Sequence, residues 1–402
     1  MKILVINGNC IQVNSSANLC HLSYIRGLID AGHEVTLLSA DGRDYTLDQS
    51  MKIPPKVKHI TYYGVSLYEQ LSLRKRANSA IAQGSPTAQT ASTGNRRWIK
   101  KAKSFVLSLY GPHGIEAAFL RKAAAFRSDE EYDYILSISH PPASHLLTHK
   151  LIKSGHIHGK HWIQIWEDPW FTDAYGFSGK EKIYREEKRL LGFAEKVCYV
   201  SPLTLENQKQ LFPESADKMY WQPLPFYYKA EKTVTHEGAN RYGYFGDYAP
   251  AARNLAPFYE AAKQTGIEVN ICGNPSNLFA ATDNIHIHPR LPLQQLKPIE
   301  DSTNVLVFLC NRKGGQIPGK IYQYSATDKT ILFIMDGTEE ERAVLKDYFG
   351  KFNRYVFCEN TAEDIARAIR QIETGDLEGV ENLPIEEFNP TVTIENILKA
   401  GS

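Results

Sequence analysis

Short apolar runs alternate with longer stretches of helical periodicity along most of the chain. This alternation is typical of α/β folds built on parallel sheets, because each buried strand is followed by a helix that covers it. In the first half the pattern predicts strands at 2–6, 34–39, 134–139, 161–166 and 197–200. It also predicts a first helix at 18–31, capped by Ser15 or Ser16 and ended by Gly32.

The alternation lapses between residues 212 and 240, where three prolines precede a polar run, and we interpret this segment as a hinge region. It then restarts, with strands expected at 242–245, 267–272, 284–288, 305–309, 330–334 and 354–357 and helices near 254–264, 318–327, 338–349 and 361–373. The prediction is two Rossmann-like, doubly wound parallel-sheet domains facing a ligand-binding cleft. We place them at 1–222 and 241–388, joined by a linker at 223–240. A C-terminal helix at 389–402 is expected to pack back on the first domain.

Composition narrows the class of protein. A chain of 402 residues is long enough for two domains, and its net charge of +1 argues against a dedicated nucleic-acid binder. The six cysteines show no CxxC spacing, and Cys198, Cys272 and Cys310 lie in apolar runs, so we predict buried thiols in a reducing compartment. No apolar run approaches the roughly 18 residues of a membrane span. The N-terminal apolar run predicts a strand rather than a signal peptide, and a cytoplasmic location is expected.

The clearest local signal is a glycine loop between a buried strand and a helix, at Gly314-Gly315-Gln316-Ile317-Pro318-Gly319-Lys320. A helix N-terminus attracts phosphate, and Lys320 adds a full positive charge there. Gln323 lies one turn further on the same face, where it could contact a group attached to that phosphate. The alternative is an ordinary crossover helix with a solvated lysine.

One segment interrupts the α/β rhythm, because residues 70–115 contain no acidic residue and eight basic ones. Its middle, 77–95, is composed mainly of small polar residues, and its end, 98–110, has the pattern of a basic amphipathic helix. Residues 74–110 are therefore candidates for contact with an anionic membrane surface. A solvated insertion and a partner-protein surface are the alternatives.

Several familiar sites are excluded by their missing motifs, namely the P-loop, the dinucleotide-binding GxGxxG, HExxH, paired CxxC and GxSxG. His286 and His288 would share one face of a strand, but a structural role is favoured over a metal site, and we expect no metal.

Polar clusters follow two predicted strands of the first domain, at 137–145 and 164–170. Within them, His140 and Asp168 are candidates for contacts to a hydroxylated substrate. The alternatives are a helix-entry residue that bonds backbone for His140 and an Asp-Pro turn for Asp168.

Three of these motifs in register resemble bacterial GT-B glycosyltransferases of the broad family 4 group that assembles capsule, O-antigen and exopolysaccharide. They are Ser139-His140-Pro141-Pro142-Ala143-Ser144, Ile165-Trp166-Glu167-Asp168-Pro169-Trp170 and Pro318-Gly319-Lys320-Ile321-Tyr322-Gln323-Tyr324. The resemblance covers nearly the whole chain. It implies transfer of a sugar from a nucleotide-sugar, usually with retention and without a cofactor or metal. It also implies a donor held by the C-terminal domain and a glycan or lipid-linked acceptor held by the N-terminal one.

Site residues carried over from the resemblance begin with Lys320, which matches the diphosphate-binding lysine. Gly246 matches the glycine beside the diphosphate, Arg253 is a second phosphate cation, and Gly273 is where backbone approaches the base. Gly315 completes the donor loop.

The chain also departs from the family pattern. Gln323 stands where the family carries the glutamate that accepts from the ribose hydroxyls, and Gln316 occupies the other acidic position. The first loop offers Asn14-Ser15-Ser16 in place of a Gly-Gly pair, as an acceptor or phosphate loop.

The leading hypothesis is therefore a retaining glycosyltransferase of surface-polysaccharide assembly, cytoplasmic or peripheral at the inner face of the membrane. A catalytically inactive scaffold or regulatory subunit is one alternative, motivated by the two glutamines. A nucleotide-sugar epimerase or hydrolase is another.

Overall fold

A computed structural model describes residues 1–66, 112–173, 180–227, 240–313 and 315–401. The described chain forms two compact units. The first unit contains Met1–Val200, Gln208–Gln222 and Ile394–Ser402, and the second contains Ser201–Asn207 and Pro223–Thr393. Most of the basic insertion predicted at 70–115 lies outside the described residues.

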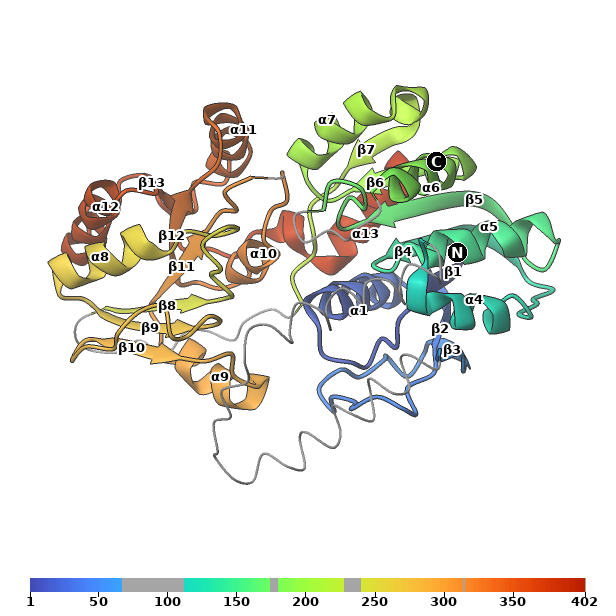
Figure 1. Ribbon diagram of the computed structural model, residues 1–402, viewed down its shortest axis with the longest axis horizontal. Helices are drawn as coiled ribbons and strands as arrows, with labels where there is room; N and C mark the ends of the chain where they lie inside the picture. Colours follow the sequence, from blue (N-terminus) through green and yellow to red (C-terminus); the bar gives the residue numbers. More distant parts are fainter. Residues whose placement is uncertain (67–111, 174–179, 228–239, 314, 402) are drawn as a thin grey trace, which may run out of the picture. The chain divides into compact units, whose positions relative to one another are not determined.

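The first unit is built on a seven-stranded sheet in which every neighbouring pair is parallel (Figure 1). The strand order is β3-β2-β1-β4-β5-β6-β7. The strands are β1 Lys2–Asn7, β2 Glu34–Ala40, β3 Lys58–Tyr62, β4 Glu131–Ser139, β5 His158–Trp166, β6 Lys196–Tyr199 and β7 Met219–Trp221. The five predicted strands are confirmed, whereas the edge strands β3 and β7 were missed. β3 has no fully buried residue and β7 is three residues long, so neither produces an apolar run.

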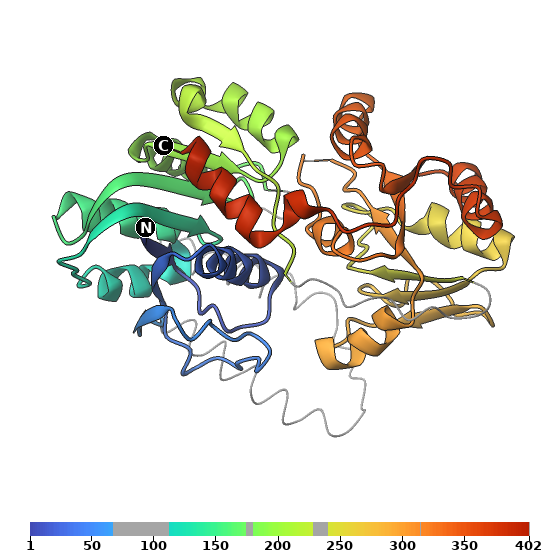
Figure 2. The ribbon, with the colours of Figure 1, turned by 180° about the vertical axis from the view of Figure 1, so that it is seen from behind.

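The first unit's helices are α1 Ser16–Asp30, α4 Ala117–Ala123, α5 Ala143–Lys153 and α6 Lys180–Phe193, with 3₁₀ turns η1 Gly114–Glu116 and η2 Pro213–Lys218. Helix α7, Pro202–Leu211, is divided, because its residues up to Asn207 belong to the second unit and the rest to the first. Helix α1 begins at Ser16, earlier than the predicted residue 18, and the predicted cap at Ser15 is confirmed, because its side chain accepts a hydrogen bond from the Asn18 N–H at 3.1 Å. The C-terminal helix α13, Pro390–Ala400, lies beside α1 (Figure 2), and His33 Nε2 is 2.6 Å from Glu395 Oε1. The Tyr220 hydroxyl also donates to the Ile397 carbonyl at 2.9 Å.

The second unit is built on a six-stranded parallel sheet in the order β10-β9-β8-β11-β12-β13 (Figure 1). The strands are β8 Arg241–Phe245, β9 Glu268–Cys272, β10 Ile285–His288, β11 Val305–Leu309, β12 Thr330–Met335 and β13 Tyr355–Glu359. Its helices are α8 Ala256–Thr265, α9 Leu293–Asp301, α10 Lys320–Tyr324, α11 Glu339–Gly350 and α12 Ala362–Thr374, with the 3₁₀ turn η3 Glu386–Phe388. α8 and α12 pack against the same apolar core. All six strands predicted for this half of the chain are confirmed, and so is the alternation of strands and helices.

Helix α10 is shorter than the helix predicted at 318–327, since only five residues are helical. Hydroxyl side chains compete for its carbonyls at the C-terminal end. Ser325 Oγ donates to the Ile321 carbonyl at 2.7 Å, and Thr327 Oγ1 donates to the Tyr324 carbonyl at 2.7 Å. Such side-chain bonds favour turns over a continuing helix.

Each sheet contains one place where the strand order reverses direction, between β1 and β4 in the first unit and between β8 and β11 in the second. Doubly wound sheets bind ligands at the carboxyl ends of the strands at this switch point. The loops that follow β1, β4, β8 and β11 are therefore where the candidate site residues should gather.

Candidate functional site

At the second unit's switch point, the loops after β8 and β9 are in backbone contact. The Gly246 N–H donates to the Cys272 carbonyl at 3.0 Å. A Cβ atom on Gly273 would lie 1.9 Å from the Gly246 carbonyl oxygen, so only glycine fits at position 273. The structure thus brings together the two glycines that the sequence assigns to the donor site.

Arg253 is fixed between the loops after β8 and β11. Its Nε donates to Asn311 Oδ1 at 2.8 Å, and its Nη1 donates to the Asp247 carbonyl at 3.1 Å. Asn311 Nδ2 in turn donates to the Gln316 carbonyl at 3.0 Å. Sequence reasoning missed Asn311, although a polar residue two positions after a buried strand at the switch point was a usable signal.

Lys320 is the first residue of α10 and is half-buried. Burial raises the pKa of the Cys272 thiol to about 12, and the positive charge of Lys320 acts on that thiol in the opposite direction. The charge of Lys320 is therefore felt at the end of β9. Because α10 has only five residues, the lysine side chain contributes more positive charge here than the helix dipole does.

A carboxylate stands beside Gly246, but its charge is paired. Asp247 Oδ1 accepts from the Asn274 N–H at 3.0 Å, and Oδ2 lies 3.1 Å from Arg290 Nη1. Arg253 and Lys320 are the cations of this edge, and the negative charge of Glu300 on α9 also acts there, since it raises the pKa of the Cys272 thiol against the effect of Lys320.

Two predicted donor residues hold the local structure. Gln323 Oε1 accepts from the Tyr227 N–H at 2.9 Å, so the oxygen predicted to meet a ribose hydroxyl already bonds backbone. The Gly315 carbonyl accepts from Ser201 Oγ at 2.7 Å and from Thr204 Oγ1 at 3.2 Å, and Gly315 has a φ of +70°. Nucleotide contacts by these two residues stay predictions.

At the first unit's switch point, the loop after β1 packs against the loop after β4. The Gly8 N–H donates to Ser144 Oγ at 2.9 Å, and Asn9 Nδ2 donates to the His140 carbonyl at 2.8 Å. A Cβ atom on Gly8 would lie 2.6 Å from Pro141 Cγ, so the close approach requires glycine. This bond uses the His140 carbonyl, so it does not test the alternative in which the His140 side chain bonds backbone.

His140 and Asp168 lie close together, as their positions after adjacent strands predict. Burial lowers the pKa of His140 below its ordinary value of 6.5, and the charge of Asp168 acts in the opposite direction. At neutral pH His140 is therefore a neutral imidazole. Their contact with a substrate remains a prediction.

Sequence reasoning missed a buried pair beside them, Glu167 and His21. Glu167 Oε2 lies 3.2 Å from His21 Nε2, and the two side chains are 8% and 0% exposed. Burial raises the pKa of Glu167 above its ordinary value. The available signal was an acidic residue directly after a buried strand, next to the predicted Asp168.

The residues of the first loop have local partners. Asn14 Nδ2 donates to Asp48 Oδ2 at 2.6 Å, Ser15 caps α1, and Ser16 is exposed. The Asp48 carboxylate makes this loop a poor phosphate site, whereas an acceptor role for it stays a prediction.

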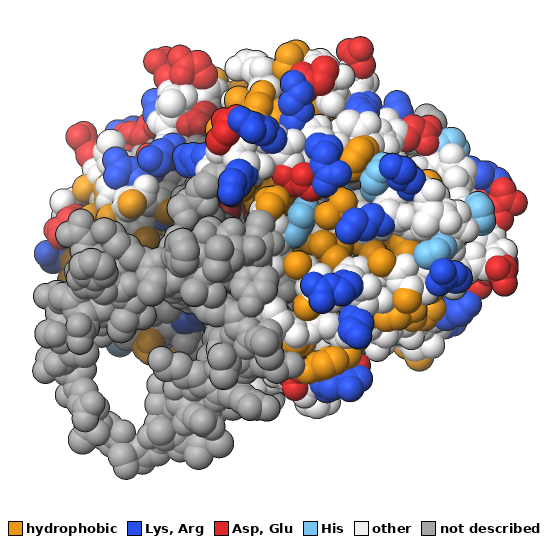
Figure 3. All heavy atoms as spheres, turned by 45° about the vertical axis from the view of Figure 1, so that its right-hand side comes forward, with side chains coloured by type: hydrophobic (Ala, Val, Ile, Leu, Met, Phe, Trp, Pro, Cys, Tyr) orange, Lys and Arg blue, Asp and Glu red, His pale blue; other side chains and the backbone are white. Residues whose placement is uncertain are grey.

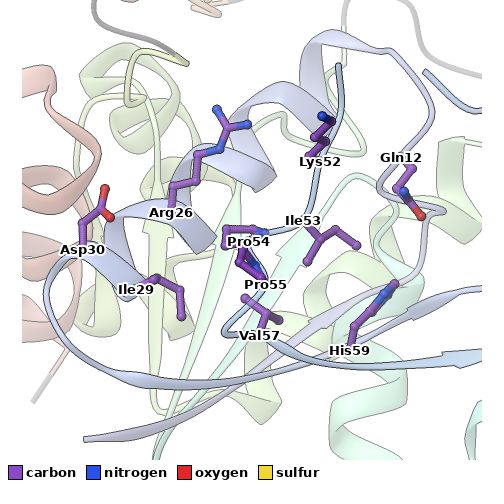
Figure 4. A pocket seen from close by; sticks show the side chains of 10 residues that line it. All are labelled: Gln12, Arg26, Ile29, Asp30, Lys52, Ile53, Pro54, Pro55, Val57 and His59. Carbon is purple, nitrogen blue, oxygen red and sulfur yellow. The ribbon is translucent and has the colours of Figure 1, made fainter. Parts of the chain in front are cut away.

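A separate hollow of about 820 Å³ lies beside α1 (Figure 4). Arg26 and Asp30 of the helix line it opposite Lys52, Ile53 and the residues that lead into β3. Its charged side chains are of both signs, and each is exposed or half-buried, so it has no built polar site.

Two features are absent from the part of the chain that the structure describes. No three histidine, cysteine, aspartate or glutamate side chains are grouped so that they could hold a metal ion. No described helix has the length and apolar character needed to cross a membrane. The prediction that Cys198, Cys272 and Cys310 are buried thiols is confirmed.

No family model matches the sequence, and no curated protein sequence matches it either. Solved structures do match. A sucrose-phosphate synthase from Thermosynechococcus elongatus has a TM-score of 0.57 at 12% identity, over 100% of this chain and 96% of that one. A glycosyltransferase from Rickettsia africae has a TM-score of 0.54 at 10% identity, and the match covers 99% of this chain and 97% of that one. S. aureus MnaA, solved with UDP, has a TM-score of 0.50 at 10% identity, and the match covers 99% of this chain and 94% of that one.

At identities this low the matches establish the fold alone. They extend over nearly the full length of both chains, so they cover both Rossmann-like units. The GT-B fold predicted from the sequence is confirmed.

Proposed function

We propose that this protein is a glycosyltransferase that moves a sugar from a nucleotide-sugar to a glycan or lipid-linked glycan acceptor in surface-polysaccharide assembly. The second unit binds the donor, and the first unit binds the acceptor. Retention of the anomeric configuration is part of the proposal, and NMR of the product tests it. The observation that carries the proposal is the cationic switch point of the second unit, where Arg253 and Lys320 accompany two closely packed glycine loops.

The chemistry of this site follows from its charges. When the bond between the sugar and the diphosphate breaks, negative charge grows on the leaving oxygen. Fixed cations lower the energy of that state without reorganising, and one such group is typically worth a factor of about 10²–10³ in rate. Arg253 meets this requirement because Asn311 holds it, and Lys320 because it begins a helix packed on the sheet.

The structural matches add fold-level support. The three solved structures reported above include a named glycosyltransferase, a named synthase and a protein bound to UDP. Since one fold can host several functions, this support is analogy, whereas the charged residues at the switch point are particular to this chain.

One observation favours a second candidate function, an inactive scaffold of the same fold. Gln323, which replaces the family glutamate, uses its oxygen to accept from the Tyr227 backbone N–H. A side chain held in this way supports the loop and leaves the ribose without that acceptor.

Nucleotide binding decides between the two. A thermal-shift and calorimetric screen against UDP, GDP, CMP, dTDP and ADP should give a rise in melting temperature with one of them, since a ligand that binds the folded state stabilises it. Lys320→Ala should abolish the rise, and Lys313→Ala, an exposed lysine of the same loop, should retain it. No shift with any nucleotide would favour the scaffold.

A peripheral membrane location is a further part of the proposal. It rests on the basic residues at 74–110, which lie outside the described residues. Figure 3 shows Lys, Arg, Asp and Glu side chains interspersed over the described part of one face, in keeping with the net charge of +1. Flotation with anionic and with neutral vesicles, for the full chain and for a variant with 74–110 replaced by a neutral linker, tests this location.

A further inference from the structure

A directed chain of hydrogen bonds in the first unit runs to His21, whose Nε2 faces Glu167. The Asn9 N–H donates to Asn7 Oδ1 at 2.8 Å, which fixes the orientation of the Asn7 amide. Asn7 Nδ2 is then the atom that meets His21 Nδ1, at 2.6 Å. Because an amide nitrogen can only donate, His21 Nδ1 accepts, and the imidazole hydrogen lies on Nε2, facing Glu167.

The two oxygens of Glu167 are in different situations. Oε2 lies 3.2 Å from His21 Nε2. Oε1 is buried and has no hydrogen-bond partner among the residues that the structure describes. A buried carboxylate oxygen without a partner is costly, so its presence indicates that something else bonds to it.

Glu187 in the same unit shows what a structural buried glutamate looks like. Its Oε1 accepts from the Trp170 N–H at 3.2 Å, and its Oε2 accepts from the Phe171 N–H at 2.6 Å. Both of its oxygens are therefore used within the fold. Glu167 differs because its Oε2 faces only His21 Nε2, at 3.2 Å, and its Oε1 has no hydrogen-bond partner among the described residues.

The surroundings of Glu167 define the class of that ligand. Asp168 follows it directly, and both carboxylates act on the Cys20 thiol of α1, while Asp168 also acts on His140 after β4. Carboxylates grouped in this way repel phosphate and favour a hydrogen-bond donor. A sugar hydroxyl is such a donor, and it is what an acceptor brings to a glycosyltransferase.

We propose that Glu167 is a catalytic residue that receives the proton of the attacking acceptor hydroxyl, with His21 and Asn7 as positioning residues. This role rests on the proposed function. The acceptor oxygen forms the new bond to the anomeric carbon as the bond from that carbon to the diphosphate oxygen breaks. The electron pair of the broken bond stays on the diphosphate, and the hydroxyl proton moves to Glu167 Oε1 and from there to solvent. The role concerns that proton and is compatible with either anomeric outcome.

Glu167→Gln tests the catalytic role, because glutamine has the same shape but cannot take up a proton. Loss of a general base typically lowers the rate by about 10²–10⁴-fold. We expect kcat to fall at least 100-fold while the nucleotide still raises the melting temperature as in the wild type. Glu195→Gln, which changes an exposed glutamate of the same unit, should leave kcat unchanged.

The pH profile separates a base from a merely structural residue. The groups around Glu167 that titrate or carry charge are His21 and Cys20 on α1, Asp168 beside it and His140 after β4. Wild-type kcat should fall at acid pH, since a protonated Glu167 accepts no proton. That acid limb should be missing from the residual activity of Glu167→Gln.

Two substitutions of His21 test its positioning role. In His21→Gln the amide can accept from Asn7 and donate to Glu167, so turnover and the acid limb should be largely retained. His21→Leu fills the space without either bond, so it should shift the acid limb and lower turnover about tenfold or more. Equal effects of the two variants would refute the positioning role.

The assay follows release of the nucleoside diphosphate from the nucleotide-sugar that matches the screened nucleotide, with water and with p-nitrophenyl glycosides as acceptors. Turnover in the wild type with at least a 100-fold loss in Glu167→Gln supports the inference. Wild-type turnover that Glu167→Gln retains overturns the inference and leaves the proposed function standing. A wild-type protein that binds no nucleotide, or turns over no nucleotide-sugar, refutes the proposed function and the role of Glu167 with it.

Discussion

The carboxyl edges of the two parallel sheets share a topology but carry different charged side chains. In the second unit, loops after parallel strands carry Arg253 and Lys320, and the adjacent Asp247 is paired with Arg290. In the first unit, the equivalent edge carries Glu167 and Asp168 beside two histidines. The doubly wound sheet thus sets the edge at which ligands bind, and the few side chains after each strand set the charge that a ligand would meet there.

This contrast predicts that the two units have separate roles, and substitutions in each unit can test that prediction. Changes in the second unit should affect the nucleotide, and changes in the first unit should affect the acceptor or the first unit's stability.

Within the second unit, the largest expected effect is at Lys320. Lys320→Ala removes the half-buried cation whose charge is felt at the end of β9, and turnover should fall about 10²–10³-fold with the fold intact. Steady-state kinetics beside circular dichroism measure this, with Lys313→Ala as the control. Turnover within twofold of the wild type would show that the charge contrast has no role in catalysis.

Glu187 is the buried glutamate of the first unit that we contrast with Glu167, because both of its oxygens accept backbone hydrogen bonds. Burial raises its pKa from 4.5 to about 7, with bonds from Phe171 and Trp170 acting in the opposite direction. A pKa raised on folding gives stability that is complete below pH 4.5 and is lost as the pH rises through 7. Relative to Glu187→Gln, the wild type should therefore lose roughly 3 kcal/mol of unfolding free energy between those pH values.

Urea unfolding of both proteins at a series of pH values, followed by tryptophan fluorescence, measures this difference. Parallel pH profiles for the two proteins would mean that Glu187 has an ordinary pKa in the folded state.

Alanine substitutions at Gly273 and Gly8 test whether each unit binds its own ligand. A Cβ on Gly273 would meet the Gly246 carbonyl, whereas a Cβ on Gly8 would meet the Pro141 ring. Each alanine variant should lose about 1–3 kcal/mol of stability, and Gly273→Ala should lose more because backbone yields less than a side chain. Gly273→Ala should also weaken nucleotide binding, and Gly8→Ala should not. Calorimetry with the screened nucleotide checks the second part, and equal affinities would contradict it.

The smallest expected effect is at Asn311, which holds Arg253. Asn311→Ala removes one hydrogen bond to the guanidinium and one to the Gln316 carbonyl. Since such a bond is worth about 1 kcal/mol, nucleotide affinity should drop several-fold, to about tenfold. The Asn284→Ala variant, at an exposed asparagine of the same unit, should bind like the wild type. Unchanged affinity for Asn311→Ala would mean that Arg253 needs no support.

The amino-acid pattern was sufficient for the strongly periodic parts of the fold. The buried strands β1 and β11 have continuous apolar runs, and α11 and α12 begin at Thr338 and Thr361, whose side chains cap them. It was insufficient for β3, which has no fully buried residue, for β7, which is only three residues long, and for α10, which hydroxyl groups after Tyr324 shorten. In these elements contacts distant in sequence or side-chain competition outweigh periodicity.

By itself, the sequence determined the class of fold, the two units' strand patterns and the loops that carry Lys320, Arg253, His140 and Asp168, because periodicity and strand ends are local properties of the chain. Only the tertiary structure decided which side chains meet. It placed Asn311 against Arg253, gave the oxygen of Gln323 to the Tyr227 backbone, and brought His21 to Glu167 across 146 positions. Such pairings depend on the order in which strands assemble into a sheet, and that order brings together residues that no local pattern connects.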